Sequence, residues 1–337
     1  MPLPLPVFLS ACLLLTCTLP TVAATIDKTQ CRKVPTGPGP HSLLMLPGEE
    51  RLLVSSHDRR HFERHGDIYE HLPGSGTMRK LPRLREPDSL AFRPHNMAVR
   101  QSGEDTLLYL INHDDDTPNS IQHSVVVYAI TADGLEFRQQ LRHHLLSSPN
   151  HIALAPDGDI YISNDRRNGR STMELALRQK KATIVHHRQG KGWRIVAEGL
   201  SFPNGVHAEQ DRVLVSKTFG SAVLAYQRNG DGSLGKPRTV ISLPLLDGIF
   251  PSLSRSVHYT ISHASLFDFL QHKRNGRHAS AATIHAVNAD TGASSVIFSD
   301  DGLLISGLSA VIETRNAFFL GQSFEPFLLR CPPLRRS

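Results

Sequence analysis

Four short segments of the sequence place histidine, asparagine or aspartate directly before a hydrophobic run. They are 94–97 (PHNM), 149–152 (PNHI), 203–206 (PNGV) and 246–249 (LDGI), at intervals of 55, 54 and 43 residues. Asparagine and aspartate oxygens are ligands that suit Ca²⁺, and histidine can act as a general base near neutral pH. Each segment alone is an ordinary turn that opens a strand. Their regular recurrence instead indicates that these side chains meet at one site.

The elements that would position these residues are short strands. Runs of β-branched and aliphatic residues alternate with Gly, Asn, Asp and Pro turns, as in 105–112 (DTLLYLIN) and 152–163 (IALAPDGDIYIS). A strand–turn–strand unit that recurs every ~40–50 residues is typical of propeller blades. We therefore predict an all-β chain with a six-bladed β-propeller over residues 25–337. A sandwich or an up-and-down barrel is the alternative. A propeller brings one residue per blade to its axis, which would gather the four segments.

The first 24 residues differ from the rest of the chain. They contain no Lys, Arg, Asp or Glu, and an apolar run is followed by small residues. This pattern predicts a signal peptide over residues 1–24, and a secreted or periplasmic protein. A membrane anchor, or a lipid attached at Cys17, is the alternative. Membrane association would then require that the segment stays uncleaved.

Removal of such a segment leaves two cysteines, Cys31 and Cys331, near opposite ends of the mature chain. In an oxidising compartment they suggest one disulfide, whereas two free thiols are the other reading. In the chain-entropy model, closing so long a loop stabilises the fold by about 4–5 kcal/mol, although measured gains are often smaller. A bond between the ends requires the ends to be neighbours, as they are in a circular fold.

The charge pattern argues against nucleic-acid binding. The net charge is +6 with 19 histidines, but the basic residues are scattered. Runs such as 58–60 (DRR) and 166–167 (RR) are short and lack interleaved aromatic residues, so they are interpreted as solvated surface charge. The sequence has no G-x-S-x-G motif, which disfavours a serine hydrolase of that type.

Several motifs together resemble one family. They are PHNMAV at 94–99, LINHDD at 110–115, PNHIALAPDGDIYISND at 149–165, LSFPNGV at 200–206, LDGI at 246–249, SH at 262–263 and SGLSAV at 306–311. In their order and spacing the chain resembles the paraoxonase/arylesterase family and, more distantly, gluconolactonase-like and strictosidine-synthase-like propellers. The resemblance covers nearly all of the chain after residue 24.

The resemblance implies a six-bladed propeller with two calcium ions in its central tunnel and a disulfide between Cys31 and Cys331. It also implies hydrolysis of lactones or aryl esters, with a small-molecule substrate. The residues it assigns are the metal ligands Asn150, Asn204 and Asp247, the proton-relay pair His95 and His113, and a further active-site histidine, His263.

The chain departs from the family pattern at the metal sites. Gly248 stands where the family has a second ligand after the aspartate, and His41-Ser42 stands where it has a Glu-Asp pair. His151 replaces an aspartate. We therefore predict that the second, structural calcium site is lost. The remaining site could bind Ca²⁺ weakly, bind Zn²⁺ or another transition ion through His41, or bind no metal.

These features predict a metal-dependent hydrolase of lactones or aryl esters. The rival hypothesis is a propeller that binds a ligand or a protein without catalysis. A condensing activity of the strictosidine-synthase type would need a positioned carboxylate, for which Glu325 is the candidate. The sequence does not specify the oligomeric state.

Overall fold

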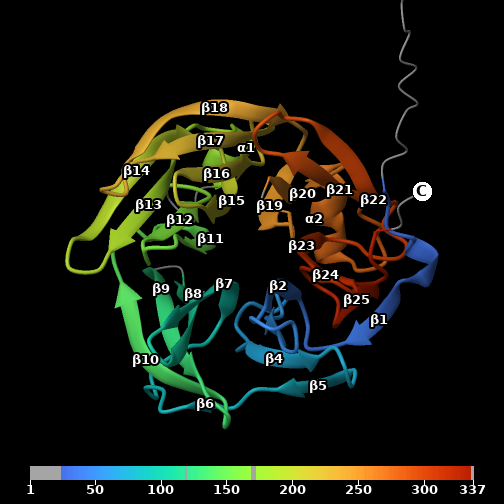
Figure 1. The fold of residues 1–337 in the computed structure, drawn as a ribbon, viewed down its shortest axis with the longest axis horizontal. Helices are drawn as coiled ribbons and strands as arrows, with labels where there is room; N and C mark the ends of the chain where they lie inside the picture. The colour runs from blue at the N-terminus through green and yellow to red at the C-terminus, as the bar shows by residue number, and fades with distance from the viewer. Residues whose placement is uncertain (1–23, 118–119, 168–171, 255, 335–337) are drawn as a thin grey trace, which may run out of the picture.

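The computed structural model describes residues 24–117, 120–167, 172–254 and 256–334. Six sheets stand around a central axis and confirm the predicted six-bladed β-propeller (Figure 1). Residues 1–23, almost all of the predicted signal peptide, lie outside the described residues.

Each blade contains four main strands that follow one another from the axis outward. Blade 1 is β2 (Pro40–Met45), β3 (Leu52–Ser56), β4 (Asp67–Leu72) and β5 (Thr77–Lys80). Blade 2 is β7 (Pro94–Ser102), β8 (Asp105–Thr117), β9 (Ser120–Ile130) and β10 (Leu135–Arg142), with the short β6 (Arg83–Leu84) at its edge. Blade 3 is β11 (Pro149–Leu154), β12 (Ile160–Asn164), β13 (Ala182–Arg188) and β14 (Gly192–Leu200). Blade 4 is β15 (Pro203–Ala208), β16 (Arg212–Lys217), β17 (Ala222–Arg228) and β18 (Leu234–Ser242). Blade 5 is β19 (Leu246–Pro251), β20 (Val257–His263), β21 (Ala282–Asn288) and β22 (Ser294–Asp300). Blade 6 is β23 (Leu308–Glu313), β24 (Phe318–Gln322), β25 (Phe327–Cys331) and β1 (Arg32–Pro35).

The core lies between the blades. The second strands β3, β12 and β24 are buried at every residue, because neighbouring blades cover both of their faces. A strand covered on both faces has apolar residues in succession instead of in strict alternation, as in 52–54 (LLV) and 318–320 (FFL).

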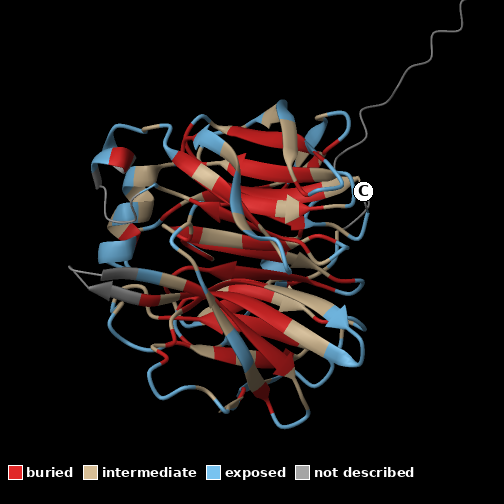
Figure 2. Cartoon of the chain, turned by 90° about the vertical axis from the view of Figure 1, so that its left-hand side faces the viewer, coloured by how far each residue is buried: buried red, intermediate tan, exposed pale blue. Residues whose placement is uncertain are grey.

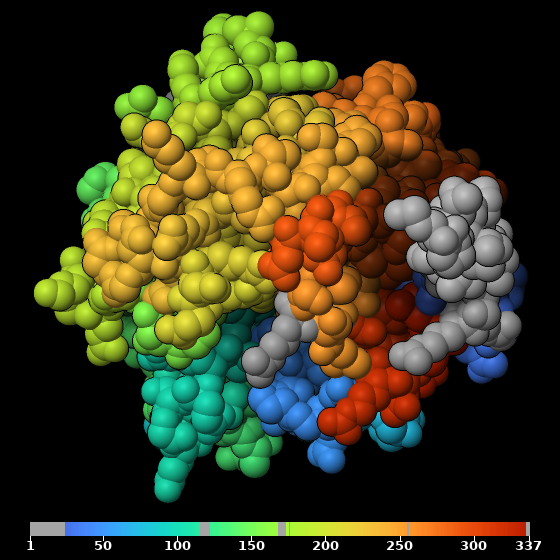
Figure 3. Space-filling view, turned by 45° about the horizontal axis from the view of Figure 1, so that its top comes forward, coloured from blue at the N-terminus to red at the C-terminus, as the bar shows by residue number. Residues whose placement is uncertain are grey.

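The two ends of the chain close the ring in one blade. Strand β1 pairs antiparallel with β25, so the first strand completes the sheet made by the last three. The disulfide Cys31–Cys331 joins the same two segments across 300 residues of sequence and confirms the predicted bond. The blue and red ends lie side by side in both the ribbon and the space-filling view (Figures 1 and 3).

Replacing both Cys31 and Cys331 with serine is expected to lower the free energy of unfolding by about 3 kcal/mol. This value lies below the chain-entropy figure because the β1–β25 pairing still holds the ends together. Urea unfolding of the double variant, beside the wild type under oxidising and reducing conditions, measures it. The reduced wild type should match the double variant, and a stability equal to that of the oxidised protein would contradict the prediction.

Two helices lie on one face of the propeller (Figure 2). They are α1 (Thr172–Ala176) and α2 (Leu266–Arg274). Helix α2 begins where Ser265 accepts a hydrogen bond from the backbone N–H of Asp268 at 3.2 Å, an N-cap that satisfies a free donor of the first turn. In the described part of the chain, neither helix has the length and apolar character needed to cross a membrane.

Candidate functional site

The first strand of every blade carries an irregularity in its pairing near its first residue. The pairing with the second strand shifts after Pro40, Pro94, Pro149, Pro203, Leu246 and Leu308. The residue after this position therefore has no partner in the second strand. In blades 1 to 6 it is His41, His95, Asn150, Asn204, Asp247 and Ser309, in that order. A β-bulge of this kind redirects a side chain, here toward the axis.

Five of these six bulge residues line one central cavity of about 300 Å³: His41, His95, Asn150, Asn204 and Asp247. His263, at the end of β20, lines it as well. The structure therefore brings together six of the seven non-cysteine residues that the sequence singled out. The seventh, His113, lies behind His95, with ring centroids 5.0 Å apart.

A row of histidines leads away from the cavity. The ring of His41 lies 4.3 Å from that of His95, and Nδ1 of His113 lies 2.9 Å from Nδ1 of His123. Burial, followed by nearby positive charge, lowers the pKa of His41, His95 and His113 well below the ordinary value. These imidazoles are neutral at pH 7 and have a free lone pair for a proton, although burial also makes them weaker bases than a free histidine.

Asp247 is the carboxylate at the bulge of blade 5. Its Oδ2 lies 3.3 Å from Nε2 of His263, and its side chain is mostly buried. Asp165 is a second carboxylate on the cavity wall, but it already accepts hydrogen bonds from Ser148 and Arg166.

The mouth of the cavity is apolar. Five phenylalanines and four leucines line the cavity: Phe62, Phe202, Phe219, Phe269, Phe324, Leu245, Leu246, Leu266 and Leu270. Three of these side chains come from α2, so this helix helps to build the mouth. A cavity with apolar walls and a few polar groups at its base is typical of a site for a small apolar molecule.

One further lining residue is not identified by the sequence patterns. Arg59, in the loop between β3 and β4, lines the cavity, so the interpretation of the run 58–60 as solvated surface charge is wrong at this residue. Its backbone lies outside the blade repeat, so no spacing argument selects it. Glu325, the carboxylate considered for a condensing activity, pairs instead with Arg60 and His272.

The residues around Asp247 fit a calcium ion poorly. Ca²⁺ takes six to eight oxygen ligands, usually with several carboxylates. Here the available groups are one carboxylate, which is paired with His263, and the amides of Asn150 and Asn204. His41 offers nitrogen, and its Nδ1 lies 3.2 Å from Oγ of Ser323. The guanidinium of Arg59 interacts electrostatically with the same carboxylate.

The region of the predicted lost calcium site contains neutral side chains. Oγ of Ser42 accepts hydrogen bonds from Nδ2 of Asn96 and the backbone N–H of Met97, both at 3.3 Å. Oδ1 of Asn96 accepts one from the N–H of Ile152 at 3.1 Å. Both ring nitrogens of His151 are buried without a partner among the described residues. The absence of this second site stays a prediction.

A candidate metal-binding triad lies further along the strands. It consists of His207, Glu209 and His258. Within the described ranges, only these three residues place three possible metal ligands (a histidine nitrogen, a cysteine sulfur or a carboxylate oxygen) within 4.8 Å of one another. Nε2 of His258 lies 2.9 Å from Oε1 of Glu209, and Arg212 pairs with the other carboxylate oxygen. Burial would raise the pKa of Glu209, but the hydrogen bonds from His258 and Arg212 outweigh it and lower the pKa to about 2.

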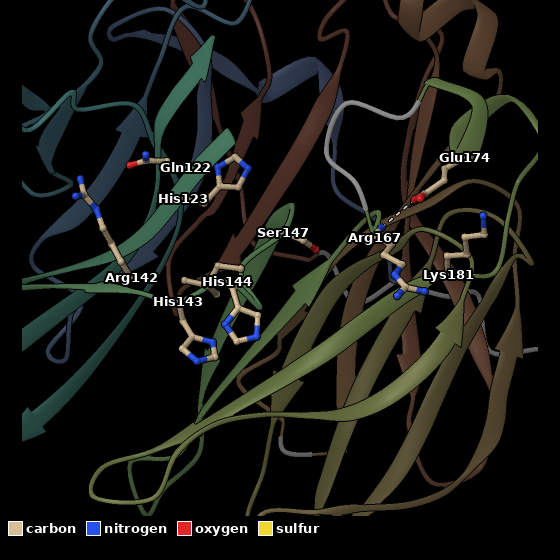
Figure 4. A pocket seen from close by; sticks show the side chains of 10 residues that line it. Gln122, His123, Arg142, His143, His144, Ser147, Arg167, Glu174 and Lys181 are labelled. Atoms are coloured by element: carbon tan, nitrogen blue, oxygen red, sulfur yellow. Dashed lines mark hydrogen bonds between the residues drawn. The ribbon is translucent and has the colours of Figure 1, made fainter. Parts of the chain in front are cut away.

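A second concavity, an open groove of about 800 Å³, lies between blades 2 and 3 (Figure 4). His123, His143 and His144 face it from one side, and Arg167 and Lys181 from the other. The backbone N–H of Arg167 donates to Oε2 of Glu174 at 2.9 Å. Because His123 contacts His113, the row of histidines runs from the central cavity to this groove.

Comparison with known proteins supports the family resemblance. A family model described as arylesterase matches residues 12–328. No curated protein matches the sequence.

Solved structures share the fold. One is described as a putative gluconolactonase (12% identity, TM-score 0.59, covering 93% of this chain and 95% of that one). Another is the PQQ-bound aldose sugar dehydrogenase of Streptomyces coelicolor (15% identity, TM-score 0.58, 92% and 98%). A third is the periplasmic gluconolactonase of Pseudomonas aeruginosa (13% identity, TM-score 0.52, 88% and 87%).

Proposed function

This chain belongs to the arylesterase family, and we propose that it is a secreted hydrolase of lactones or aryl esters with apolar acyl groups. The observation that carries the proposal is the convergence of the bulge residues on one cavity. His95, Asn150, Asn204 and Asp247 come from four blades and meet below a mouth of phenylalanines and leucines.

In this proposal, the apolar mouth holds the acyl chain or the aromatic ring and excludes water from it. His95 takes a proton from the attacking water, because it is neutral and lines the cavity. His113 does not line the cavity, so it positions His95 and relays the proton toward His123. His263 fixes the orientation of Asp247 through their contact.

Negative charge develops on the carbonyl oxygen as water attacks, and a preorganised donor must stabilise it. The side-chain amides of Asn150 and Asn204 lie at the base of the cavity and can donate hydrogen bonds there. The family resemblance implies a calcium ion in this role. Since the residues present fit calcium poorly, no step of the proposal depends on one.

The test is hydrolysis of phenyl acetate and a panel of γ- and δ-lactones by the purified mature protein. Each substrate is assayed after exhaustive chelation, and again after addition of Ca²⁺ or Zn²⁺. Turnover by the wild type that is lost in a His95→Gln preparation supports the proposal. If the folded protein turns over none of the substrates in any condition, the proposal is wrong and a ligand-binding propeller becomes the better hypothesis.

A further inference from the structure

The loop between β3 and β4 directs one arginine into the central cavity. Nη2 of Arg60 donates to Oε1 of Glu325 at 2.8 Å and to the carbonyl of His272 at 2.9 Å, which fastens the loop to α2 and blade 6. On the other side, Oδ1 of Asp58 accepts from the backbone N–H of Arg60 at 3.1 Å. Between these anchors the side chain of Arg59 lines the cavity.

One edge of the Arg59 guanidinium, formed by Nε and Nη2, makes no hydrogen bond with the described residues. Its Nε and Nη2 atoms are buried, and neither has a hydrogen-bond partner among the described residues. These two atoms form one edge of the guanidinium, where parallel N–H groups match the two oxygens of a carboxylate. Burying a charge without such partners is costly. Among the described residues, no ion pair holds the guanidinium along this edge.

Arg59 also places a positive charge on the cavity wall, which Lys273 of α2 lines as well. Burial lowers the pKa of Arg59 to about 10, against the opposing effect of Asp247, so the group stays charged at neutral pH. Its charge acts on His41 and His95, two of the bulge residues that surround the cavity base. The positive charge of Arg59 balances the negative charge of Asp247. A divalent cation added there would be repelled by Arg59.

We propose that Arg59 is the resident cation of this cavity in place of a divalent metal, and that its guanidinium binds the carboxylate of an apolar monocarboxylic acid. The proposal rests on the proposed function, in which that acid is the product. Water adds to the carbonyl carbon and the bond to the leaving oxygen breaks. The products are a carboxylate, an alcohol and one proton, which leaves through His95. The same guanidinium holds the carbonyl oxygen while its negative charge develops.

The walls define the ligand further. Phe62 lines the cavity from the same loop as Arg59, and the rings of Phe324 and of Phe269 on α2 lie 5.5 Å apart between centroids. A carboxylate with a plain alkyl or aryl group places its charge at Arg59 and its apolar part among these rings.

The experiment is calorimetric titration of octanoate into the purified mature protein, with a chelator present throughout. The wild type should bind octanoate and not octanamide, which has the same shape without the charge. Arg59→Met should weaken octanoate binding at least tenfold, and Arg59→Lys should weaken it less. Arg64→Met, in the same loop, removes an exposed arginine paired with Asp58 and should leave the affinity unchanged. Melting temperatures confirm that the variants are folded.

Equal octanoate affinity in Arg59→Met and the wild type would overturn the inference. So would octanoate binding that is absent with the chelator and appears only in a separate titration with Ca²⁺ and no chelator. Ester turnover measured in parallel separates the two proposals. Arg59-dependent octanoate binding without turnover of any ester supports this inference and contradicts the proposed function. Turnover that is lost on chelation and unaffected by Arg59→Met contradicts this inference alone.

Discussion

Replacing His95 with glutamine is expected to lower kcat for ester or lactone hydrolysis by about 100-fold or more, which is the usual contribution of a positioned general base. Glutamine keeps a polar side chain of similar reach but cannot take a proton from water. His95 is buried and lines the cavity, and its Nδ1 has no partner among the described residues. A change in kcat with little change in KM would show that proton transfer is lost rather than substrate binding.

Two further histidine variants make this result specific. His113→Gln should lower kcat less, because His113 acts on the substrate only through His95. His187→Gln, on β13 and outside the central cavity, should leave kcat unchanged. If kcat of a folded His95→Gln variant equals that of the wild type, His95 is not the base.

The polar residues that recur once per blade could be predicted, because the direction of each side chain depends on its own short segment. A proline or leucine, a polar residue and then a hydrophobic strand recur once per blade, and the bulge at this point turns the polar side chain to the axis. Asn150, Asn204 and Asp247 therefore reach the cavity because of their own segments. The closing disulfide was also predictable, since a circular fold makes the two ends neighbours.

Arg59 could not be predicted in this way, because its position depends on contacts far away in the sequence. Its loop is held by Arg60 against Glu325 and His272, which belong to the last third of the chain. No local pattern distinguishes an arginine in such a loop from a solvated one. The phenylalanines of the mouth share this difficulty, because they come from separate loops and from α2.

The turn at 156–159 (PDGD) gives a third case. The sequence indicates a hairpin, and the structure has a turn between β11 and β12. Asp159, however, is also the centre of a buried ion-pair cluster. Its carboxylate accepts from Nε of Arg188 at 2.6 Å and from Nη2 of Arg228 at 2.9 Å, and it lies 2.8 Å from Nε2 of His186. Because Arg228 belongs to blade 4, the cluster joins blades 3 and 4.

Replacing Asp159 with asparagine is expected to lower the free energy of unfolding by about 3–5 kcal/mol at pH 7. The side chains of Asp159 and Arg228 are only 3% and 2% exposed, so the variant removes the buried carboxylate charge that Arg228 shares with Arg188 and His186. Asp157→Asn is the matched control. Asp157 contacts Arg228 as well, but its side chain is 39% exposed, and its loss should cost less than about 1 kcal/mol.

The pH dependence of the stability difference between the wild type and Asp159→Asn tests whether the charge of Asp159 causes that difference. Burial would raise the pKa of Asp159, but hydrogen bonds from Arg188, His186 and Arg228 outweigh it and lower the pKa to about 2. The unfolded chain has a value of about 3.9. A depressed pKa contributes stability that is fully present above the unfolded value and disappears as the pH falls from about 4 to 2. Urea unfolding should therefore show a gap between wild type and Asp159→Asn that is constant from pH 5 to 7 and narrows at pH 3. A gap of the same size at pH 3 and pH 7 would mean that packing, and not charge, is responsible for it.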